Sequence, residues 1–246
     1  MSVGLCAYAI TREHVLAPLS PVGIRLITHR GLGLVVAEVE LAPFAALGAD
    51  PARWTAEPAE DDPLVVLARR HDVVVRAVFE HQPVLPLRFG TILRDEQAAV
   101  RLLANHHGEA STWLGRVDGH REWGVRARAA APGKPAATPT DGLSGTEYLA
   151  MRRNRLTAAA RTRRDAFTAA EALHEELTRH ATECVPRKRK TATPLLDAAY
   201  LVPVNAEPAF HDETTRHDEL AVEVTGPWPP YSFVRLELSA EEVAHA

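Results

Sequence analysis

The chain has 246 residues, of which 46% are hydrophobic and 24% are charged. That balance is typical of a folded globular protein of one or two domains, and it argues against a disordered or fibrous chain. With 28 basic and 32 acidic residues the net charge is −4, so the chain as a whole is not a polyanion binder.

Cysteine usage and the N-terminus bear on the cellular compartment. Cys6 and Cys184 are too few and too far apart for a disulfide framework, which favours a reducing compartment. The first ten residues lack a basic segment and are followed by polar residues, so no signal peptide is expected. The apolar runs are far shorter than the roughly 20 residues that a membrane span needs. We therefore expect a soluble, cytoplasmic protein.

The first half of the chain predicts strands and helices in an alternating order. A helix begins at Asp62-Pro63, an N-cap followed by proline at the first helical position. Pro86 argues that the strand following this helix is an edge strand or bulged. The expected strands cover Leu5–Ile10, Ile24–Thr28, Leu32–Glu40 and Val84–Leu93, the third of them half-exposed, with a short helix over Thr11–Leu19 and a loop or short helix over Pro43–Glu60. The order strand, helix, strand, strand, helix, strand is ferredoxin-like.

The second half resembles a shortened version of the first. After a connecting helix over Asp95–Val117, a strand is expected over Glu122–Ala130 and a loop over Ala131–Asp141. Ser144 and Glu147 have the spacing of a capping box, which starts a helix over residues 144–184 that is too long for its domain and should project or bend. Its heptad-like seam comprises Leu149, Leu156, Ala170 and Leu177; beyond it come a strand over Leu195–Val204, a polar helix over Ala206–Asp218, and strands over Leu220–Thr225 and Tyr231–Leu238.

The predicted fold class is therefore α+β, with two ferredoxin-like domains whose antiparallel sheets are covered by helices. The first domain comprises residues 1–118, including the connecting helix. The second comprises residues 119–246 and contains the long Arg-rich helix.

Motifs for catalysis are sparse. Gly31-Leu32-Gly33 lacks the third glycine of a dinucleotide loop, and His174-Glu175-Glu176-Leu177 lacks the second histidine of a zinc-protease motif. His71 lies on the apolar stripe of its helix, which favours a hydrogen-bonded core histidine over a ligand or base. One cluster of polar side chains could either bind a metal or form a solvated polar face, and we favour the solvated face. The cluster comprises His211, Asp212, Glu213, His217 and Asp218. No catalytic residue, cofactor or metal is expected.

A basic cluster lies on the long helix and beyond it. The cluster comprises Arg152, Arg153, Arg155, Arg161, Arg163 and Arg164, followed by the Arg187–Lys190 run. Such a footprint is typical of nucleic-acid binding. Acidic residues follow on the same helix, however, so a solvated face or docking to an acidic partner is favoured.

Two segments carry a resemblance to a known family. Pro83–Thr91, PVLPLRFGT, resembles a signature of the gas-vesicle protein F/L family, and Thr225–Phe233, TGPWPPYSF, resembles that family's C-terminal segment. Ala199–Val202 and the Glu147–Leu149 helix start with Arg152 and Arg153 also fit, as does Tyr8–Ile10. The matches run in consistent order from residue 8 to residue 233, although the Lys134 loop and the Arg187–Lys190 run lie outside them.

The resemblance implies a non-catalytic assembly factor and minor component of gas vesicles, located in the cytoplasm with them. Members are held to bind the small hydrophobic shell protein, limit its aggregation and help nucleate vesicles; other gas-vesicle accessory proteins are further expected partners, and nucleic acid and membrane are not. Trp228 and Tyr231 either pack on their own domain or form an aromatic platform for a partner. The candidate partner-binding residues are Arg88, Phe89, Arg152, Arg153, Trp228 and Tyr231. The rival hypotheses are a small ferredoxin-like enzyme of the monooxygenase type and a nucleic-acid-binding module that uses the arginine-rich face.

Overall fold

The computed structural model describes residues 3–13, 23–42, 44, 62–130, 144–187, 194–239 and 242. Contacts divide the chain into two compact units: unit 1 combines Met1–Gly119 with Trp228–Ala246, and unit 2 is His120–Pro227. The boundary expected between residues 118 and 119 thus lies beside Gly119. Residues 228–246 group with unit 1, whereas the sequence-based division placed them in the second domain.

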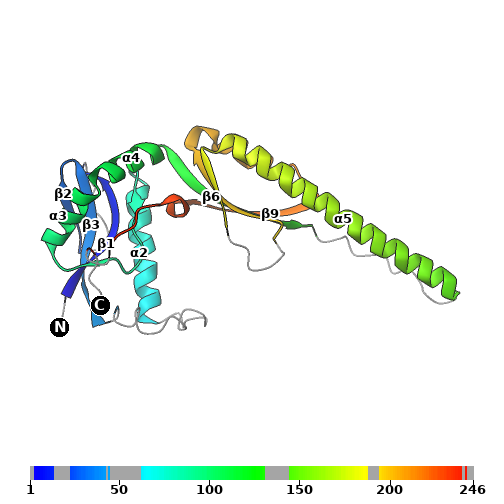
Figure 1. The fold of residues 1–246 in the computed structure, drawn as a ribbon, viewed down its shortest axis with the longest axis horizontal. Helices are drawn as coiled ribbons and strands as arrows, with labels where there is room; N and C mark the ends of the chain where they lie inside the picture. The colour runs from blue at the N-terminus through cyan, green and yellow to red at the C-terminus, as the bar shows by residue number, and fades with distance from the viewer. Residues whose placement is uncertain are drawn as a thin grey trace. The chain divides into compact units, whose positions relative to one another are not determined.

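Unit 1 contains an antiparallel sheet in the strand order β2-β3-β1-β4, with β5 paired to β1 (Figure 1). Its strands are β1 (Val3–Arg12), β2 (Ile24–His29), β3 (Leu32–Glu40), β4 (Leu85–Pro86) and β5 (Ile92–Leu93). Helix α2 (Pro63–Phe79) lies between β3 and β4 in the chain, as the ferredoxin-like order requires. Asp62 caps this helix by accepting a hydrogen bond from the Leu64 backbone N–H at 2.9 Å.

Helix α2 buries its apolar stripe against the sheet. Val74, Val75 and Val78 of the helix form one core cluster with Cys6, Tyr8, Val35, Ala37 and Val39 of β1 and β3. Two further helices, α3 (Glu96–Asn105) and α4 (His107–Val117), also contact this sheet. Strand β3 is consequently buried at successive positions from Leu32 to Ala37, so the expected half-exposed alternation holds only at its end, where Glu38 and Glu40 are exposed.

Two other expectations for unit 1 were wrong. Val84–Leu93 is not one strand, because a turn with Gly90 at φ 85° separates the two-residue strands β4 and β5. The connecting helix Asp95–Val117 is two helices that break at His106, where residues of weak helix propensity follow one another (Asn105, His106, His107 and Gly108).

Unit 2 repeats the same connectivity. Its sheet has the order β7-β8-β6-β9, formed by β6 (His120–Ala129), β7 (Glu183–Pro186), β8 (Leu196–Pro203) and β9 (Leu220–Trp228). Helix α5 (Gly145–His180) follows β6, and the 3₁₀ turn η2 (Val204–Ala206) leads into α6 (Glu207–Glu213) after β8. The core cluster joins Ala166, Ala170, Leu173 and Leu177 of α5 to Tyr200, Val202 and Phe210.

The elements expected in the second half of the chain need four corrections. Helix α5 ends at His180, and the short strand β7 follows where the helix was expected to continue to residue 184. The polar helix begins as η2 and ends at Glu213. Tyr231–Leu238 is not a strand: it begins as the 3₁₀ turn η3 (Tyr231–Phe233), after two prolines that cannot donate ladder hydrogen bonds. Of the seam residues, Ala170 and Leu177 are buried, but Leu149 and Leu156 are exposed.

The capping box at Ser144 and Glu147 is confirmed, as is an exposed N-terminal half of α5. Within the described part of the chain, no helix is long and apolar enough to span a membrane. Most of Thr11–Leu19, Pro43–Glu60 and Ala131–Asp141, together with Lys188–Lys190, lies outside the described residues; Thr11 and Arg12 belong to β1.

Candidate functional site: the signature groove

The segment Leu87–Thr91, here called the signature loop, leaves the sheet between β4 and β5. Leu87 N donates to Tyr8 O at 2.9 Å, and Ala7 N donates to Thr91 O at 2.9 Å, so both ends of the loop are fixed to β1. Between them the Thr91 hydroxyl donates to Arg88 O at 2.7 Å and closes a tight turn. Arg88 is exposed at this turn, while Leu87 is buried, as their alternation in the sequence predicts.

His71 of α2 supports the signature loop from the core side. Its Nε2 lies 3.0 Å from Leu87 O, and because a carbonyl only accepts, Nε2 carries the proton. The ring meets Phe89 edge-on, with 5.8 Å between centroids. Burial lowers the pKa of His71, while the Leu87 hydrogen bond and the Asp72 charge act in the opposite direction. His71 is therefore a buried, neutral histidine that positions the loop; the sequence had predicted a hydrogen-bonded core histidine here.

The second signature segment begins where β9 ends. Gly226 has φ 136°, and a Cβ added there would lie 2.9 Å from Glu122 O, so only glycine fits. The Gly226–Pro227 bond is cis, and Pro229 and Pro230 are buried. The chain then continues as Val234–Ser239, which together with Trp228–Phe233 and Glu242 is called the C-terminal strap.

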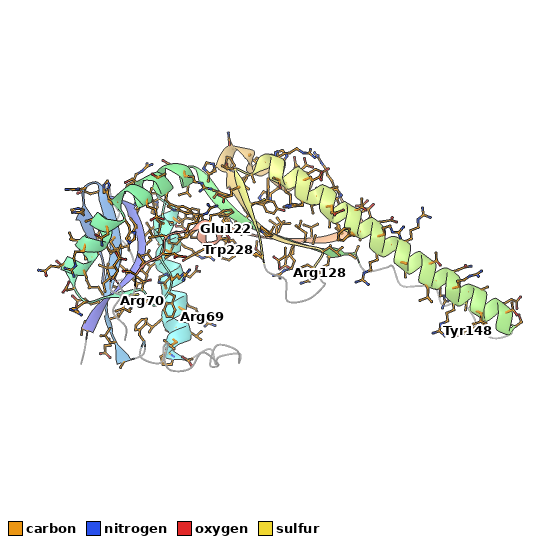
Figure 2. All side chains as sticks on the ribbon, in the orientation of Figure 1. Arg69, Arg70, Glu122, Arg128, Tyr148 and Trp228 are labelled. Atoms are coloured by element: carbon orange, nitrogen blue, oxygen red, sulfur yellow. The ribbon has the colours of Figure 1, made fainter. Side chains whose placement is uncertain are left out.

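Trp228 begins the strap and packs on α2 (Figure 2). The Arg76 guanidinium carbon lies 3.8 Å from the centroid of the indole ring, and Arg76 Nε donates to Asp72 Oδ2 at 2.6 Å. A cation–π contact at such a partly exposed site contributes about 0.5–1 kcal/mol. The indole is half-buried, so one part of it packs within unit 1 and another part remains accessible.

The first signature segment and the C-terminal strap, which begins in the second signature segment, meet at one groove in unit 1, which we call the signature groove. Its volume is about 510 Å³. One wall is the signature loop with Pro86, and the other is the strap, through Tyr231, Val234, Leu236, Glu237 and Leu238. Segments about 140 residues apart in the sequence therefore form one surface of mixed polar and apolar character, on which Arg88, Tyr231 and Glu237 are exposed while Leu87 and Leu236 are buried.

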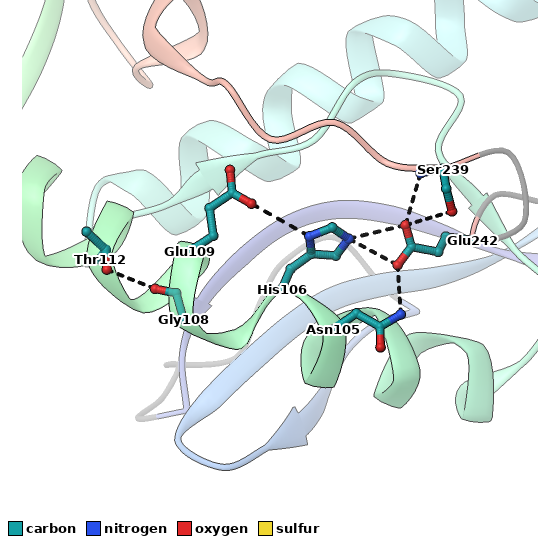
Figure 3. Close-up of polar contacts among 7 residues, drawn as sticks. All are labelled: Asn105, His106, Gly108, Glu109, Thr112, Ser239 and Glu242. Atoms are coloured by element: carbon teal, nitrogen blue, oxygen red, sulfur yellow. Dashed lines mark hydrogen bonds and ion pairs between the residues drawn. The ribbon is translucent and has the colours of Figure 1, made fainter.

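The strap is attached to the junction of α3 and α4 by Glu242 (Figure 3). The carboxylate accepts from Asn105 Nδ2 at 3.0 Å and lies 3.0 Å from His106 Nε2, and Ser239 N and Oγ donate to it at 2.9 and 3.0 Å. Burial favours the neutral acid, but the hydrogen bonds outweigh it and lower the pKa of Glu242 to about 2. We call this set of contacts the strap latch.

The structure brings together only part of the predicted site. Arg88, Phe89 and Tyr231 line the signature groove, and Trp228 belongs to the same unit on α2. Arg152 and Arg153 lie on the exposed half of α5 in unit 2. Sequence reasoning missed Arg76 and Glu242, although two spacings signalled them: Asp72 and Arg76 are four residues apart, and Ser239 and Glu242 have capping-box spacing.

The polar cluster considered for a metal is divided among other partners. His211 packs edge-on against Trp123 at 4.3 Å, Glu213 pairs with Arg216 at 2.6 Å, and His217 Nε2 lies 2.9 Å from Glu176 Oε2. No group of three or more His, Cys, Asp or Glu side chains suited to a metal occurs among the described residues.

The fold defines a two-domain α+β protein with two ferredoxin-like sheets, and its first unit carries an open groove. The chain matches the family model described as "Gas vesicle synthesis protein GvpL/GvpF" over residues 4–235. It is 35% identical to gas vesicle protein L of Streptomyces sp. (strain CB03234), covering 90% of this chain and 85% of the relative. It is 27% identical to gas vesicle protein F2 of Halobacterium salinarum, covering 88% and 82%. The chain therefore belongs to the gas vesicle protein GvpL/GvpF family, and its function relates to gas vesicles.

Solved structures agree on the fold. The crystal structure of the gas vesicle protein GvpF from Anabaena sp. PCC7120 superposes with a TM-score of 0.66 at 17% identity, covering 96% of this chain and 98% of that one. GvpF from Microcystis aeruginosa gives a TM-score of 0.61 at 19% identity, covering 95% and 99%. Both similarities extend over the two units.

Proposed function

We propose that the chain is a gas-vesicle assembly factor that binds the small hydrophobic shell protein, limits its aggregation and helps nucleate vesicles in the cytoplasm. The signature groove carries the proposal, because the first signature segment forms one of its walls and the second signature segment contributes Tyr231 to the other. Other gas-vesicle accessory proteins are proposed as further partners.

The lining of the groove combines apolar and polar groups, as protein interfaces commonly do. Leu87 and Leu236 are buried, so the apolar surface that an entering side chain would meet comes from the half-buried Phe89, Val234 and Leu238. Arg88 and Tyr231 are exposed at the edge and are residue types that commonly anchor protein interfaces. Arg88 and Glu237 supply charges of both signs there, which can orient the client without being buried.

The proposal assigns no catalytic reaction to the groove. The ionisable side chains that line it are Arg88, Tyr231 and Glu237, and neither a histidine nor a cysteine lines it within the described residues. His71 lies close by but is buried, and its Nε2 proton is engaged by Leu87 O. A catalytic site needs an acid, a base and a nucleophile that converge on the substrate, and the described lining of the groove carries one carboxylate, Glu237, so a binding role is favoured over the monooxygenase-type alternative.

Co-expression with the shell protein tests the proposal. The chain should lower the fraction of shell protein that pellets, and the double variant Arg88→Glu with Tyr231→Ala should lose most of this effect. Arg94→Glu is the matched control, because Arg94 is an exposed arginine in the same stretch that does not line the groove. An unchanged pelleted fraction with the parent chain, or equal losses in both variants, would contradict the proposal.

A further inference from the structure

The N-terminal half of α5 has no covering surface among the described residues. From Thr146 to Asp165 every position is exposed except Met151, which is half-buried. Large apolar side chains are nonetheless present: Leu149 and Leu156 are each 65% exposed and Phe167 is 49% exposed. Within unit 2 this half of the helix extends past the ends of the strands (Figure 1), with Tyr148 near its tip (Figure 2).

These exposed side chains form one straight stripe. Leu149, Leu156, Ala160 and Phe167 follow one another at intervals of seven, four and seven residues. At about 100° per residue they fall within about 20° of a common line, and the eleven-residue repeat keeps that line nearly parallel to the helix axis. A stripe this narrow is typical of a helix-to-helix seam, whereas a helix on a globular core has an apolar face at least about 100° wide.

The stripe is not an extension of the core of unit 2. The packed face of α5 is formed by Ala166, Ala170, Leu173 and Leu177. At about 100° per residue its centre is rotated by about 90° from the stripe, so one straight helix cannot bury both against the same sheet. The stripe therefore points in a different direction from the packed face of α5, and burying it would take a different partner.

Arginines flank the stripe on both sides. Arg152 and Arg163 lie about 40–60° to one side, and Arg153 and Arg164 lie about 40–60° to the other. Between Gly145 and Arg164 the helix carries six arginines and one carboxylate, Glu147, whose side chain is engaged in the capping box. An apolar seam with charged flanks is the arrangement by which paired helices choose their partners.

We propose that residues 147–167 of α5 form a docking helix for an acidic amphipathic helix of another protein, one with a narrow apolar stripe flanked by carboxylates. A second copy of this chain would place arginine against arginine, in either orientation. A nucleic acid would use the arginines but not the central stripe, and an anionic membrane would suit a broader apolar face. The docking helix belongs to unit 2 and is a different surface from the signature groove.

A synthetic helical peptide tests the recognition directly. The probe is a 21-residue peptide with leucines at the stripe spacing and glutamates on both flanks; its control is a scrambled peptide of the same composition. The parent chain should bind the probe at least about tenfold more tightly than the scrambled peptide, and Arg152→Glu with Arg164→Glu should weaken binding by about tenfold or more. Leu156→Ser should also weaken binding, whereas Ala158→Ser on the opposite face should not. The exposed positions keep folding intact, checked by an unchanged Tm.

Photo-crosslinking in vesicle-forming cells tests the partner. A photoreactive residue at Leu156 should crosslink to a gas-vesicle protein through an acidic amphipathic segment, and the same group at Ala158 should not. Three other outcomes would each overturn the proposal. They are crosslinks to a second copy of this chain, stripe-dependent recruitment to phosphatidylglycerol vesicles without probe binding, and tighter binding of a DNA duplex than of the probe. Equal binding of probe and scrambled peptide would also overturn it. The peptide measurement does not involve the shell protein, so its failure is distinguishable from failure of the proposed function.

Discussion

His71 links the core of unit 1 to the signature loop through a neutral imidazole. Its Nε2–H donates to Leu87 O, whereas Nδ1 is buried without a partner, so a second proton would have no acceptor. Because the pKa of His71 is lowered from 6.5 in the fold, the unfolded chain binds the proton more readily. His71 therefore makes its full contribution to the free energy of unfolding above about pH 6.5, and that contribution is lost as the pH falls below that value.

We expect the free energy of unfolding to fall more steeply between pH 7 and pH 5 in the parent chain than in His71→Gln, which keeps a donor for Leu87 O. Denaturant titrations at both pH values measure the difference. The other histidines are common to both proteins, so the comparison isolates His71. Parallel pH profiles would show that His71 does not titrate in this way.

Glu122 and Arg187 explain one part of the basic run that the sequence left without a role. The Glu122 side chain is 3% exposed, and Arg187 Nη2 donates to its Oε1 at 3.2 Å. Gly124 leaves the space for this guanidinium, since a Cβ there would lie 2.9 Å from Arg187 Nη1. Arg187 thus serves the interior of unit 2 by compensating a buried carboxylate.

At the scale of elements, the C-terminal strap forms a wall of the signature groove only while it is attached to unit 1. Phe233 and Leu236 provide apolar burial, and the strap latch supplies the polar attachment through Glu242. Because the folded pKa of Glu242 is about 2 against an ordinary 4.5, the latch contributes stability above about pH 4.5. That contribution is lost as the pH falls from about 4.5 towards 2.

Glu242→Gln should loosen the strap at neutral pH, because a neutral amide accepts hydrogen bonds from Asn105, His106 and Ser239 less strongly than a carboxylate. Hydrogen exchange of Val234–Ser239 should become faster, and the exchange of β8 in unit 2 should stay unchanged. Glu237→Gln is the matched control, since Glu237 lies on the same strap and lines the groove. Equal exchange in the parent and Glu242→Gln would mean that apolar burial alone holds the strap.

The elements were largely predictable because their signals are local. Asp62-Pro63 marked the start of α2, and Ser144 with Glu147 marked that of α5. Alternating residue types along the chain indicated strands β3 and β6. The resulting order of strands and helices predicted the ferredoxin-like class for both halves. The four-residue β7 escaped because its signal is short and contains Pro186. The seam through Leu149 failed because it joined two stripes that point about 90° apart.

Individual groove residues could be selected from the sequence, but their meeting in one groove could not be predicted from it. Arg88, Phe89 and Tyr231 were selected as separate motif residues, and their meeting depends on the strap returning to unit 1. That return is fixed by contacts such as Glu242 with His106, which are 136 residues apart. No local sequence pattern predicts such a pairing. A division of the chain by sequence order alone therefore assigns residues 228–246 to the second domain.

Truncation after Pro227 tests which division of the chain into domains holds. One division assigns residues 228–246 to unit 1, and the other assigns them to the second domain. If residues 228–246 belong to unit 1, their removal takes away Phe233, Leu236 and the Arg76 contact of Trp228, all within that unit. Amide protection should then fall in β1 and α4, whereas β8 and the packed half of α5 should keep theirs, because unit 2 retains its own core. Hydrogen exchange followed by mass spectrometry measures amide protection in both units in one sample. If the strap instead belonged with the second half, the loss of protection would appear in β6, β8 and β9, and the division into residues 1–118 and 119–246 would hold.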